Sequence, residues 1–288
     1  MPAKAGAPVV CLECGRVLPR EQGMFRCLDA EQRARIEPFL AQYRVVRQQD
    51  GYRADRPEYY RALPRSAPDD AQAGVWRIRQ RTFERLRREI LARGAGSAPA
   101  VLDLGAGSGW LCHRLAALGC RTVAVDLIDD EQDGLGACRH YDESFARVQA
   151  DFDRLPFAPH QFDFVVFNGS LHYAPDVAAT LKRAERMLAR GGWLIVADSP
   201  TFVDPGHGVA MTARQRERLR RQCGVETPVQ PGEGFLTLSR LQVCAAEMGR
   251  SPRFLETDDG WRSRLRRIAA AAGRRRPVPP RFGLWIAA

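Results

Sequence analysis

The stretch Val101-Leu-Asp-Leu-Gly-Ala-Gly-Ser-Gly-Trp-Leu111 decides the fold of this 288-residue chain. Residues 100–104 form a short apolar run that contains one carboxylate and ends at a glycine, which predicts a fully buried parallel strand. The glycine turn 105–109 then leads into a helical pattern over residues 110–118. A strand, a glycine turn and a helix N-terminus together form a pocket at the carboxyl edge of a sheet, where the backbone can approach a ligand closely.

The spacing of these glycines argues against two classes of phosphate ligand. The dinucleotide fingerprint G-x-G-x-x-G would need a glycine at position 110, where Trp110 stands, so the NAD or FAD interpretation fails. No G-K-[ST] sequence follows the turn, which argues against a nucleoside triphosphate site.

The segment from Asp103 to Gly109 instead resembles the first motif of the class I methyltransferases that use S-adenosylmethionine (SAM). The chemistry of SAM agrees with this resemblance. Its α-carboxylate suits the glycine turn and the helix start, and its α-ammonium suits Asp103, directly or through water. The resemblance implies that the first part of the cofactor site consists of Asp103, Gly105, Ala106, Gly107 and Gly109.

The order of the later segments strengthens the resemblance. Residues 121–126 form a second β-rich run ending in Asp126, about twenty residues beyond the turn, where a carboxylate can accept hydrogen bonds from both ribose hydroxyls. Residues 145–150 predict a third strand, and the segment after it resembles the adenine-binding segment of this class. The residues expected around the adenine are Leu127, Ile128, Asp151 and Phe152, with Asp151 binding the amino group.

The fourth predicted strand, 162–167, is followed by Asn168-Gly-Ser-Leu-His-Tyr173, which faces the expected position of the transferred methyl group. Asn168 and Gly169 are therefore further cofactor candidates. Because the sulfonium is already an activated leaving group, catalysis is largely orientation, and a base is needed only if the nucleophile must lose a proton. The catalytic candidates are His172, Tyr173 and Asp198, and shaping of the pocket is the alternative role of His172.

The span 101–198 resembles one branch of the class, the ubiquinone/menaquinone-biosynthesis-like or type 11 methyltransferases. Leu-His-Tyr and Arg-Gly-Gly stand where this branch usually has Leu-His-His and Pro-Gly-Gly. The resemblance implies an α/β fold over residues 97–288. We expect a Rossmann-like, seven-stranded, mostly parallel sheet with an antiparallel last strand over 281–287, helices on both faces and a small N-terminal extension.

In this class the segment before the first strand commonly covers the cofactor. Residues 36–96 are therefore predicted to form a helical lid or substrate segment, and packing of an N-terminal helix on the sheet is the alternative. The lid and substrate candidates are Tyr59, Tyr60, Trp76 and Arg79, together with His207 in the loop after the fifth strand.

Residues 1–35 look like the opening of a zinc ribbon, which makes zinc a second candidate cofactor. Cys11-Leu-Glu-Cys14 is followed by Cys27, and thiolates on a tight knuckle can chelate Zn²⁺ tetrahedrally. A second C-x-x-C would need a cysteine at position 30, where Ala30 stands. The nearest other ligands are Asp29 and Glu31. A degenerate ribbon that binds no metal is the alternative.

The net charge of +10 invites a nucleic-acid interpretation. All but two of the 44 basic residues are arginines, so the excess looks compositional and favours a solvated surface over an RNA footprint. A basic helical insert at about 258–276 could touch RNA, an anionic membrane or an acidic substrate, and a solvated helix is the alternative.

The sequence predicts SAM-dependent methyl transfer, by in-line displacement, to an oxygen, carbon or nitrogen of a small-molecule acceptor. The alternatives are an rRNA base methyltransferase, against which the missing fourth zinc ligand argues, and a SAM-fold binding protein without turnover. No apolar run approaches the ~20 residues of a membrane span, and the N-terminus lacks an apolar signal region. We therefore expect a cytoplasmic protein with reduced thiols.

Overall fold

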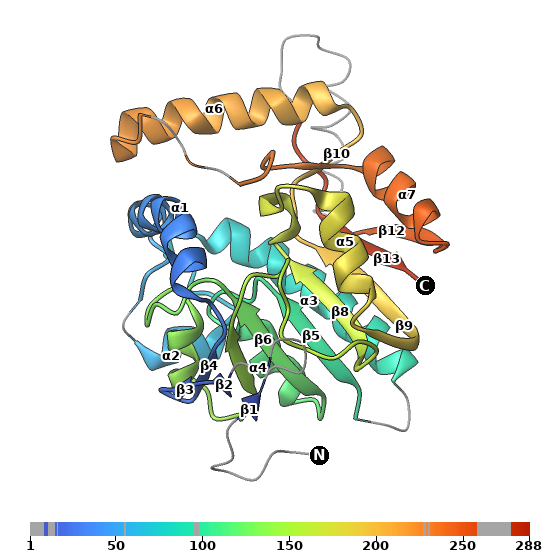
Figure 1. Cartoon of the computed structure of the whole chain (residues 1–288). Coiled ribbons are helices and arrows are strands. Elements are labelled where there is room, and N and C mark those ends of the chain that lie inside the picture. The colour runs from blue at the N-terminus through green and yellow to red at the C-terminus, as the bar shows by residue number, and fades with distance from the viewer. Residues whose placement is uncertain are drawn as a thin grey trace.

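A nine-stranded sheet runs through the computed structural model, in the order β12-β13-β9-β8-β5-β6-β7-β4-β3 (Figure 1). The structure describes residues 9–10, 15, 17–54, 56–94, 98–226, 229, 231–257 and 278–288. The basic insert at about 258–276 lies outside the described residues.

Seven of these strands form the predicted Rossmann-like sheet. They are β5 (Ala100–Leu104), β6 (Arg121–Asp126), β7 (Ala146–Gln149), β8 (Phe162–Asn168), β9 (Leu188–Ala197), β12 (Pro252–Glu256) and β13 (Gly283–Ala287). The strands from β5 to β9 pair in parallel, whereas β13 is antiparallel to both of its neighbours, β9 and β12. The predicted fold class, with its antiparallel last strand, is confirmed.

Two strands from the N-terminal segment widen the sheet beyond the seven predicted. β4 (Met24–Arg26) pairs in parallel with β7, where Phe25 lies opposite Val148, and β3 (Arg20–Glu21) pairs antiparallel with β4. β1 (Val9–Val10) and β2 (Val17–Leu18) form a separate two-stranded sheet. The described part of the N-terminal extension is thus partly built into the main sheet.

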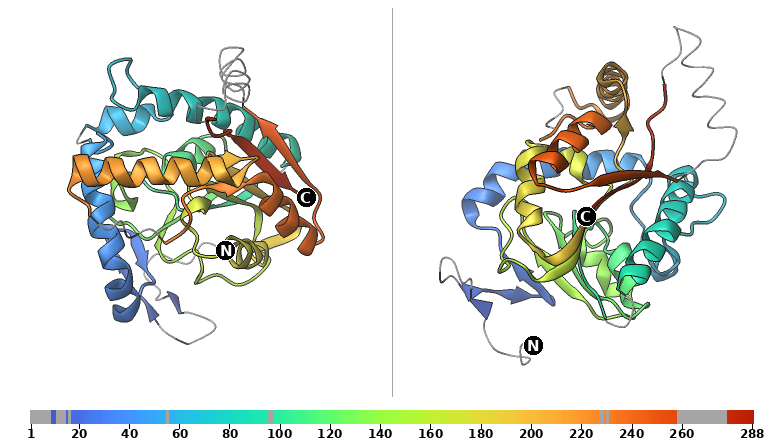
Figure 2. Two further views of the ribbon diagram at one scale, coloured as in Figure 1. Left: turned by 90° about the horizontal axis from the view of Figure 1, so that it is seen from above. Right: turned by 90° about the vertical axis from the view of Figure 1, so that its right-hand side faces the viewer.

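Seven α-helices surround the sheet in the part of the chain that the structure describes. They are α1 (Ala30–Gln49), α2 (Pro57–Ala62), α3 (Ala73–Arg93), α4 (Trp110–Ala116), α5 (Val177–Glu185), α6 (Pro205–Cys223) and α7 (Leu238–Glu247). α6 crosses one end of the molecule beside α1 (Figure 2), and Arg218 of α6 binds Asp50, the C-cap of α1, at 2.5 Å. None of the described helices combines the length and apolar character that a membrane crossing requires.

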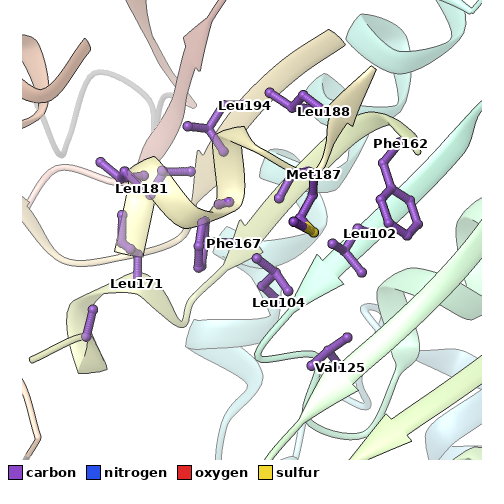
Figure 3. Packing of buried hydrophobic residues seen from close by; sticks show 14 of the residues in the cluster. Leu102, Leu104, Val125, Phe162, Phe167, Leu171, Leu181, Met187, Leu188 and Leu194 are labelled. Carbon is purple, nitrogen blue, oxygen red and sulfur yellow. The ribbon is translucent and has the colours of Figure 1, made fainter. Parts of the chain in front are cut away.

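The two faces of the sheet bury separate hydrophobic clusters because alternate strand residues point to opposite sides. Leu102 and Leu104 of β5 face α5 and pack with Phe167 and Leu181 (Figure 3). Val101, one residue before Leu102, points to the other face and belongs to the second cluster, which residues of α3 and α4 complete. Helices therefore cover both faces, as predicted, and the carboxyl ends of the central strands stay available for a site.

The short strands β10 (Thr201–Phe202) and β11 (Leu236–Thr237) pair in parallel. β10 precedes α6 and β11 follows it, so this pair brings together the segments on either side of the helix. α6 begins at Pro205 and so includes His207, which the sequence analysis placed in a loop. The Asp204 side chain accepts a hydrogen bond from the Gly206 amide at 2.8 Å, and Pro205 occupies the first helical position, a combination that favours helix initiation.

Candidate functional site

The turn between β5 and α4 is too tight for any residue but glycine at its two ends. Gly105 has φ +78°, and a Cβ there would lie 2.3 Å from the Cβ of Ser170. Gly109, the N-cap of α4, has φ +73°, and a Cβ there would lie 2.5 Å from Cys138 Sγ. Both positions therefore exclude a side chain on steric and conformational grounds. A Cβ at Gly107 would meet nothing within 4 Å, so space is open on this part of the turn.

Asp126 joins this turn to the end of β6. Its carboxylate accepts hydrogen bonds from the Gly107 amide at 2.6 Å and from the Ile128 amide at 2.8 Å. Burial raises the pKa of Asp126 to about 6, although these backbone hydrogen bonds lower it. The carboxylate is thus held rigidly at the carboxyl edge of the sheet.

The other amides of the turn are also occupied. The Gly105 and Ala106 N–H groups donate to the carbonyl of Val125 at 2.8 and 3.0 Å, and the Gly109 N–H donates to the carbonyl of Ala106 at 2.9 Å. With the Gly107 amide bound to Asp126, four of the five N–H groups in the turn already have partners. The turn itself therefore has few free donors, and the expected carboxylate contact at the turn and the start of α4 stays a prediction.

Asp103 lies behind the turn. Its side chain is almost fully buried, with 1% of its surface exposed, and its Oδ2 accepts a hydrogen bond from Cys112 Sγ at 3.8 Å. Burial, and then the negative charge of Asp126, raise the pKa of Asp103 to about 8. Asp103 does not belong to the cavity wall, so the structure gives it no direct path to a ligand ammonium.

A cavity of about 900 Å³, partly open to solvent, lies in front of the turn. This volume includes the open solvent at the mouth of the cavity. The predicted residues that line it are Gly105, Ala106, Gly107, Asp126, Leu127, Ile128, Phe152, Asn168, Gly169, Tyr173, Tyr59, Tyr60, Trp76 and Arg79. The structure therefore brings the predicted cofactor segment and the predicted lid segment together around one space.

Several predicted site residues stand outside this wall. They are Asp103, Gly109, Asp151, His172, Asp198 and His207. Asp151 pairs with Arg35 Nη2 at 3.4 Å. His207 lies in the first turn of α6 and not in a loop, because Asp204 caps that helix. Its imidazole is 38% exposed and lies 3.8 Å from Asp204, and it does not line this cavity.

The His172 ring is poorly suited to act as a general base here. Its Nδ1 lies 3.3 Å from Ser199 Oγ. Burial, and then the positive charge of Arg79, lower the pKa of His172 to about 3. An imidazole with such a pKa is neutral and a weak proton acceptor near neutral pH, which favours the pocket-shaping role.

Asp198 occupies a strained position just after β9. It has φ +51°, which is uncommon for a residue other than glycine. Burial raises the pKa of Asp198 to about 6, and the Thr82 hydroxyl and the Arg79 charge lower it. Neither carboxylate oxygen makes a hydrogen bond of standard geometry with a described residue.

A stripe of α1 side chains forms a wall that the sequence pattern did not reveal. Phe39, Tyr43 and Arg47 all line the cavity and follow one another at intervals of four, so they share one helix face. The Phe39 and Tyr43 rings contact Tyr173, with centroids 6.0 and 6.1 Å away. The i, i+4, i+8 spacing was the available signal, once residues 30–49 were known to be helical.

Arg47 is fixed in this wall by a bidentate ion pair with Asp133, at 2.5 and 2.6 Å. Its guanidinium also lies over the Tyr52 ring, 3.4 Å from the centroid. Asp133 belongs to the loop that follows β6 and carries Leu127 and Ile128. The charge of Arg47 is therefore already neutralised within the protein.

The same loop is held by two more arginines of the N-terminal segment. Arg26 of β4 pairs with Asp129 at 2.5 Å, and Arg53 pairs with Asp130 at 3.0 Å. Tyr60 adds a hydrogen bond to the carbonyl of Gln132 at 2.6 Å. The N-terminal segment thus positions the loop beside Asp126 through charge-assisted contacts.

Arg79 of α3 is a second cation in the wall. Its guanidinium lies over the Trp76 ring, 4.7 Å from the centroid. A Cβ built on Gly169 would lie 3.7 Å from Arg79 Nη2. Unlike Arg47, Arg79 makes no hydrogen bond or ion pair with any residue that the structure describes.

Cys27 is buried directly after β4, and its N–H donates to the carbonyl of Gln149 at 2.9 Å. Cys11 and Cys14, the other two predicted zinc ligands, lie outside the described residues. Within the described ranges no group of three histidine, cysteine, aspartate or glutamate side chains could hold a metal ion. The structure therefore provides no support for zinc.

Comparison with known proteins identifies the centre of the chain. Residues 102–196 match the family model described as a methyltransferase domain. A sarcosine/dimethylglycine N-methyltransferase of Halorhodospira halochloris is 31% identical over 144 residues, which are 49% of this chain and 51% of that protein. A demethylmenaquinone methyltransferase of Mycobacterium sp. (strain KMS) is 37% identical over 116 residues, 40% and 48% of the two chains. The chain thus spans about half the length of these relatives.

A solved structure shares the fold over most of the chain. It is magnesium protoporphyrin IX methyltransferase from Synechocystis PCC 6803 with bound SAH, with a TM-score of 0.55 and 14% identity over 89% of this chain and 98% of that one. Together with the sheet order, these matches show a class I methyltransferase domain at the centre of the molecule.

Proposed function

We propose that this protein transfers a methyl group from SAM to a small-molecule acceptor by in-line displacement. The observation that carries the proposal is the Asp126 carboxylate, which is anchored to the Gly107 amide and exposed to a cavity within a class I methyltransferase domain. A carboxylate at the end of the second strand suits a ribose diol, because it can accept two hydrogen bonds.

The residues present fit the rest of SAM. Leu127, Ile128 and Phe152 offer apolar surface beside Asp126 for an adenine ring. On the other side, the open space at Gly107 lets a ligand approach the backbone closely. Asn168 and Gly169, at the end of β8, line the space where the sulfonium would lie. When bound, SAM supplies the activated methyl group and its leaving group.

The acceptor is proposed to occupy the aromatic part of the cavity, between α1 and the end of β8. Phe39, Tyr43 and Tyr173 form a cluster there, with centroids 5.6 to 6.1 Å apart. Aromatic faces favour a flat, largely apolar acceptor. These rings also exclude water from the reacting atoms, which favours displacement over side reactions.

The wall offers little general-base chemistry. Of the described residues, no histidine, cysteine or glutamate lines the cavity, and its two carboxylates, Asp126 and Asp133, are engaged. The proposed acceptor is therefore an amine or an electron-rich carbon or oxygen that attacks without a strong base from the protein. The relatives named for sarcosine/dimethylglycine and demethylmenaquinone support a small-molecule acceptor.

Two further expectations stay proposals. Zinc binding by Cys11, Cys14 and Cys27 rests on their spacing alone. A cytoplasmic location likewise rests on the sequence alone.

The test of the main proposal combines binding and turnover. Calorimetry with SAM and with S-adenosylhomocysteine (SAH), the demethylated product, should show one site per chain. Transfer of a labelled methyl group should then be screened against flat amines, phenols and enolisable carbon acids. A protein that binds neither SAM nor SAH would contradict the proposal, whereas binding without turnover on any acceptor would favour the non-catalytic alternative.

A further inference from the structure

The glycine turn has few free N–H groups to offer the carboxylate of a bound SAM. Four of its five N–H groups donate to Val125, Ala106 and Asp126 within the turn and its neighbouring strand. A carboxylate taken out of water needs hydrogen-bond donors or a positive charge. If SAM occupies the site proposed above, a cation in the cavity wall would supply donors and charge in addition to the first amides of α4.

Two arginines line the cavity, and they differ in their surroundings. Both nitrogens of the Arg47 fork bind Asp133, at 2.5 and 2.6 Å, so its donors are directed away from a ligand. Arg79 has no ion pair and no hydrogen bond with any residue in the described part of the chain. Arg79 is thus the cation of the described wall whose donors are available.

The position of Arg79 matches the methionine end of the cofactor. Its Nη2 lies close to Gly169, at the end of β8, and Gly169 lines the same cavity as Gly105. Trp76 lies one turn earlier on α3, and the Arg79 guanidinium packs over its ring, 4.7 Å from the centroid. Because α3 is a 21-residue helix packed on the sheet through Leu86 and Ile90, the guanidinium projects from a rigid element.

Asp198 does not form an ion pair with the Arg79 guanidinium. The carboxylate is near enough for Arg79 to lower its pKa, yet no ion pair forms between the two within 4 Å, and the Asp198 oxygens have no hydrogen bond of standard geometry with described residues. The guanidinium fork therefore remains free to receive an incoming carboxylate, which it can bind through two parallel hydrogen bonds.

We propose that Arg79 binds the α-carboxylate of SAM and SAH and so orients the sulfonium toward the acceptor. This inference rests on the proposed function. It assigns to Arg79 a cofactor contact in place of the substrate or lid role that its sequence position suggested.

The test compares two ligands that differ in the amino-acid part. SAH carries the α-carboxylate, whereas 5′-deoxy-5′-methylthioadenosine keeps the adenine, the ribose and the sulfur but lacks it. Calorimetry measures both ligands on the full chain for wild type, Arg79→Gln and Arg79→Lys. Arg77→Gln is the matched control, because Arg77 is exposed on the same helix and does not line this cavity.

We expect Arg79→Gln to weaken SAH binding about ten- to hundredfold, the range of a lost charged hydrogen-bond pair. Methylthioadenosine binding should stay unchanged, Arg79→Lys should recover part of the SAH affinity, and Arg77→Gln should resemble wild type. Unchanged SAH affinity in Arg79→Gln would overturn the assignment, and so would an equal loss for both ligands. A raised KM for the acceptor with unchanged SAH affinity would also overturn it, because the carboxylate would then belong to the acceptor.

The two proposals fail in different ways. If wild type binds neither SAH nor methylthioadenosine, the cofactor assignment itself is wrong and the role of Arg79 falls with it. If wild type binds both ligands with equal affinity, the adenosine site stands and the carboxylate contact does not exist.

Discussion

The Gly107 amide donates a hydrogen bond to the Asp126 carboxylate at 2.6 Å, and this contact joins the turn after β5 to the end of β6. One side chain therefore shapes the turn and also presents an acceptor to the cavity. Substitution of Asp126 should therefore affect ligand binding more than most substitutions of other residues that line the cavity.

Asp126→Ala should weaken SAM binding by ~1.5–3 kcal/mol, because two charge-assisted hydrogen bonds to the ribose would be lost. Calorimetry with SAH measures this directly. Asp69→Ala, which removes an exposed carboxylate, is the control and should leave the affinity unchanged. An unchanged affinity in Asp126→Ala would show that the ribose lies elsewhere.

Asp103→Asn should stabilise the ligand-free protein, and the gain should grow as the pH rises from 5 to 8. Burial raises the pKa of Asp103 to about 8 in the folded state, so between about pH 4 and 8 the folded protein keeps a proton that the unfolded chain releases. Wild-type stability therefore falls with rising pH in this window, by up to about 1.4 kcal/mol per unit. Asparagine removes this dependence.

Urea unfolding of Asp103→Asn and wild type at pH 5 and pH 8 checks the sign. Asp69→Asn serves as the control for loss of an exposed carboxylate. A stability difference between Asp103→Asn and wild type that is the same at both pH values would mean that Asp103 is ionised in the folded protein.

Arg47→Met should destabilise the protein by about 3–5 kcal/mol, because it leaves Asp133 buried without its partner. The double variant Arg47→Met with Asp133→Leu should recover most of this loss. On the same helix Arg44→Met breaks an exposed pair with Glu37 and should cost about 1 kcal/mol or less. Additive losses in the double variant, measured by urea unfolding, would contradict a direct coupling.

If Cys11, Cys14 and Cys27 chelate zinc, protein purified without a chelator should contain about one zinc per chain. Cys27→Ala should lose the metal, whereas Cys244→Ala, which changes another buried cysteine, should retain it. Elemental analysis measures the zinc content. Protein without stoichiometric zinc would contradict chelation by these three cysteines.

We expect no specific binding of ribosomal RNA, because the arginine excess is compositional. RNA bound through phosphate contacts would lose ~0.7–0.9 log units of affinity per log unit of salt for each contact. Titration at two salt concentrations tests this, with Arg264, Arg266 and Arg267 of the basic insert replaced in parallel. Submicromolar binding at physiological salt that this variant loses would favour the rRNA alternative.

The central strands were predictable because their signals are local. The run before Gly105 and the carboxylate of Asp126 each mark the carboxyl end of a strand within a few residues. The pairing of β4 with β7 carries no such signal. It joins segments more than a hundred residues apart, as the Arg26–Gln149 hydrogen bond shows, and only the assembled sheet specifies it.

Site residues at the ends of strands were predictable from the sequence. Whether a side chain is buried or reaches the cavity was not predictable. Asp103 follows the family motif, yet the fold places it behind the turn with 1% of its surface exposed. Residues 36–96 were expected to be helical, but α1 is polar along much of its length and contains Pro38. The sequence therefore did not single out Phe39, Tyr43 and Arg47 as part of the cavity wall. His207 was expected in a loop but lies in α6, because Asp204 caps the helix and Pro205 begins it.

The pairing of β4 with β7 also affects the order in which the molecule is completed during synthesis. Arg26 and its partner Gln149 are 123 residues apart in the chain. A ribosome that adds about 5–20 residues per second takes roughly 6–25 seconds to cover that interval. Until β7 is made, β4 has no strand to pair with and Arg26 has no Gln149 to bind. The segment that holds the loop beside Asp126 is therefore made before the strands it joins, and β4 takes its place in the sheet only after β7 exists.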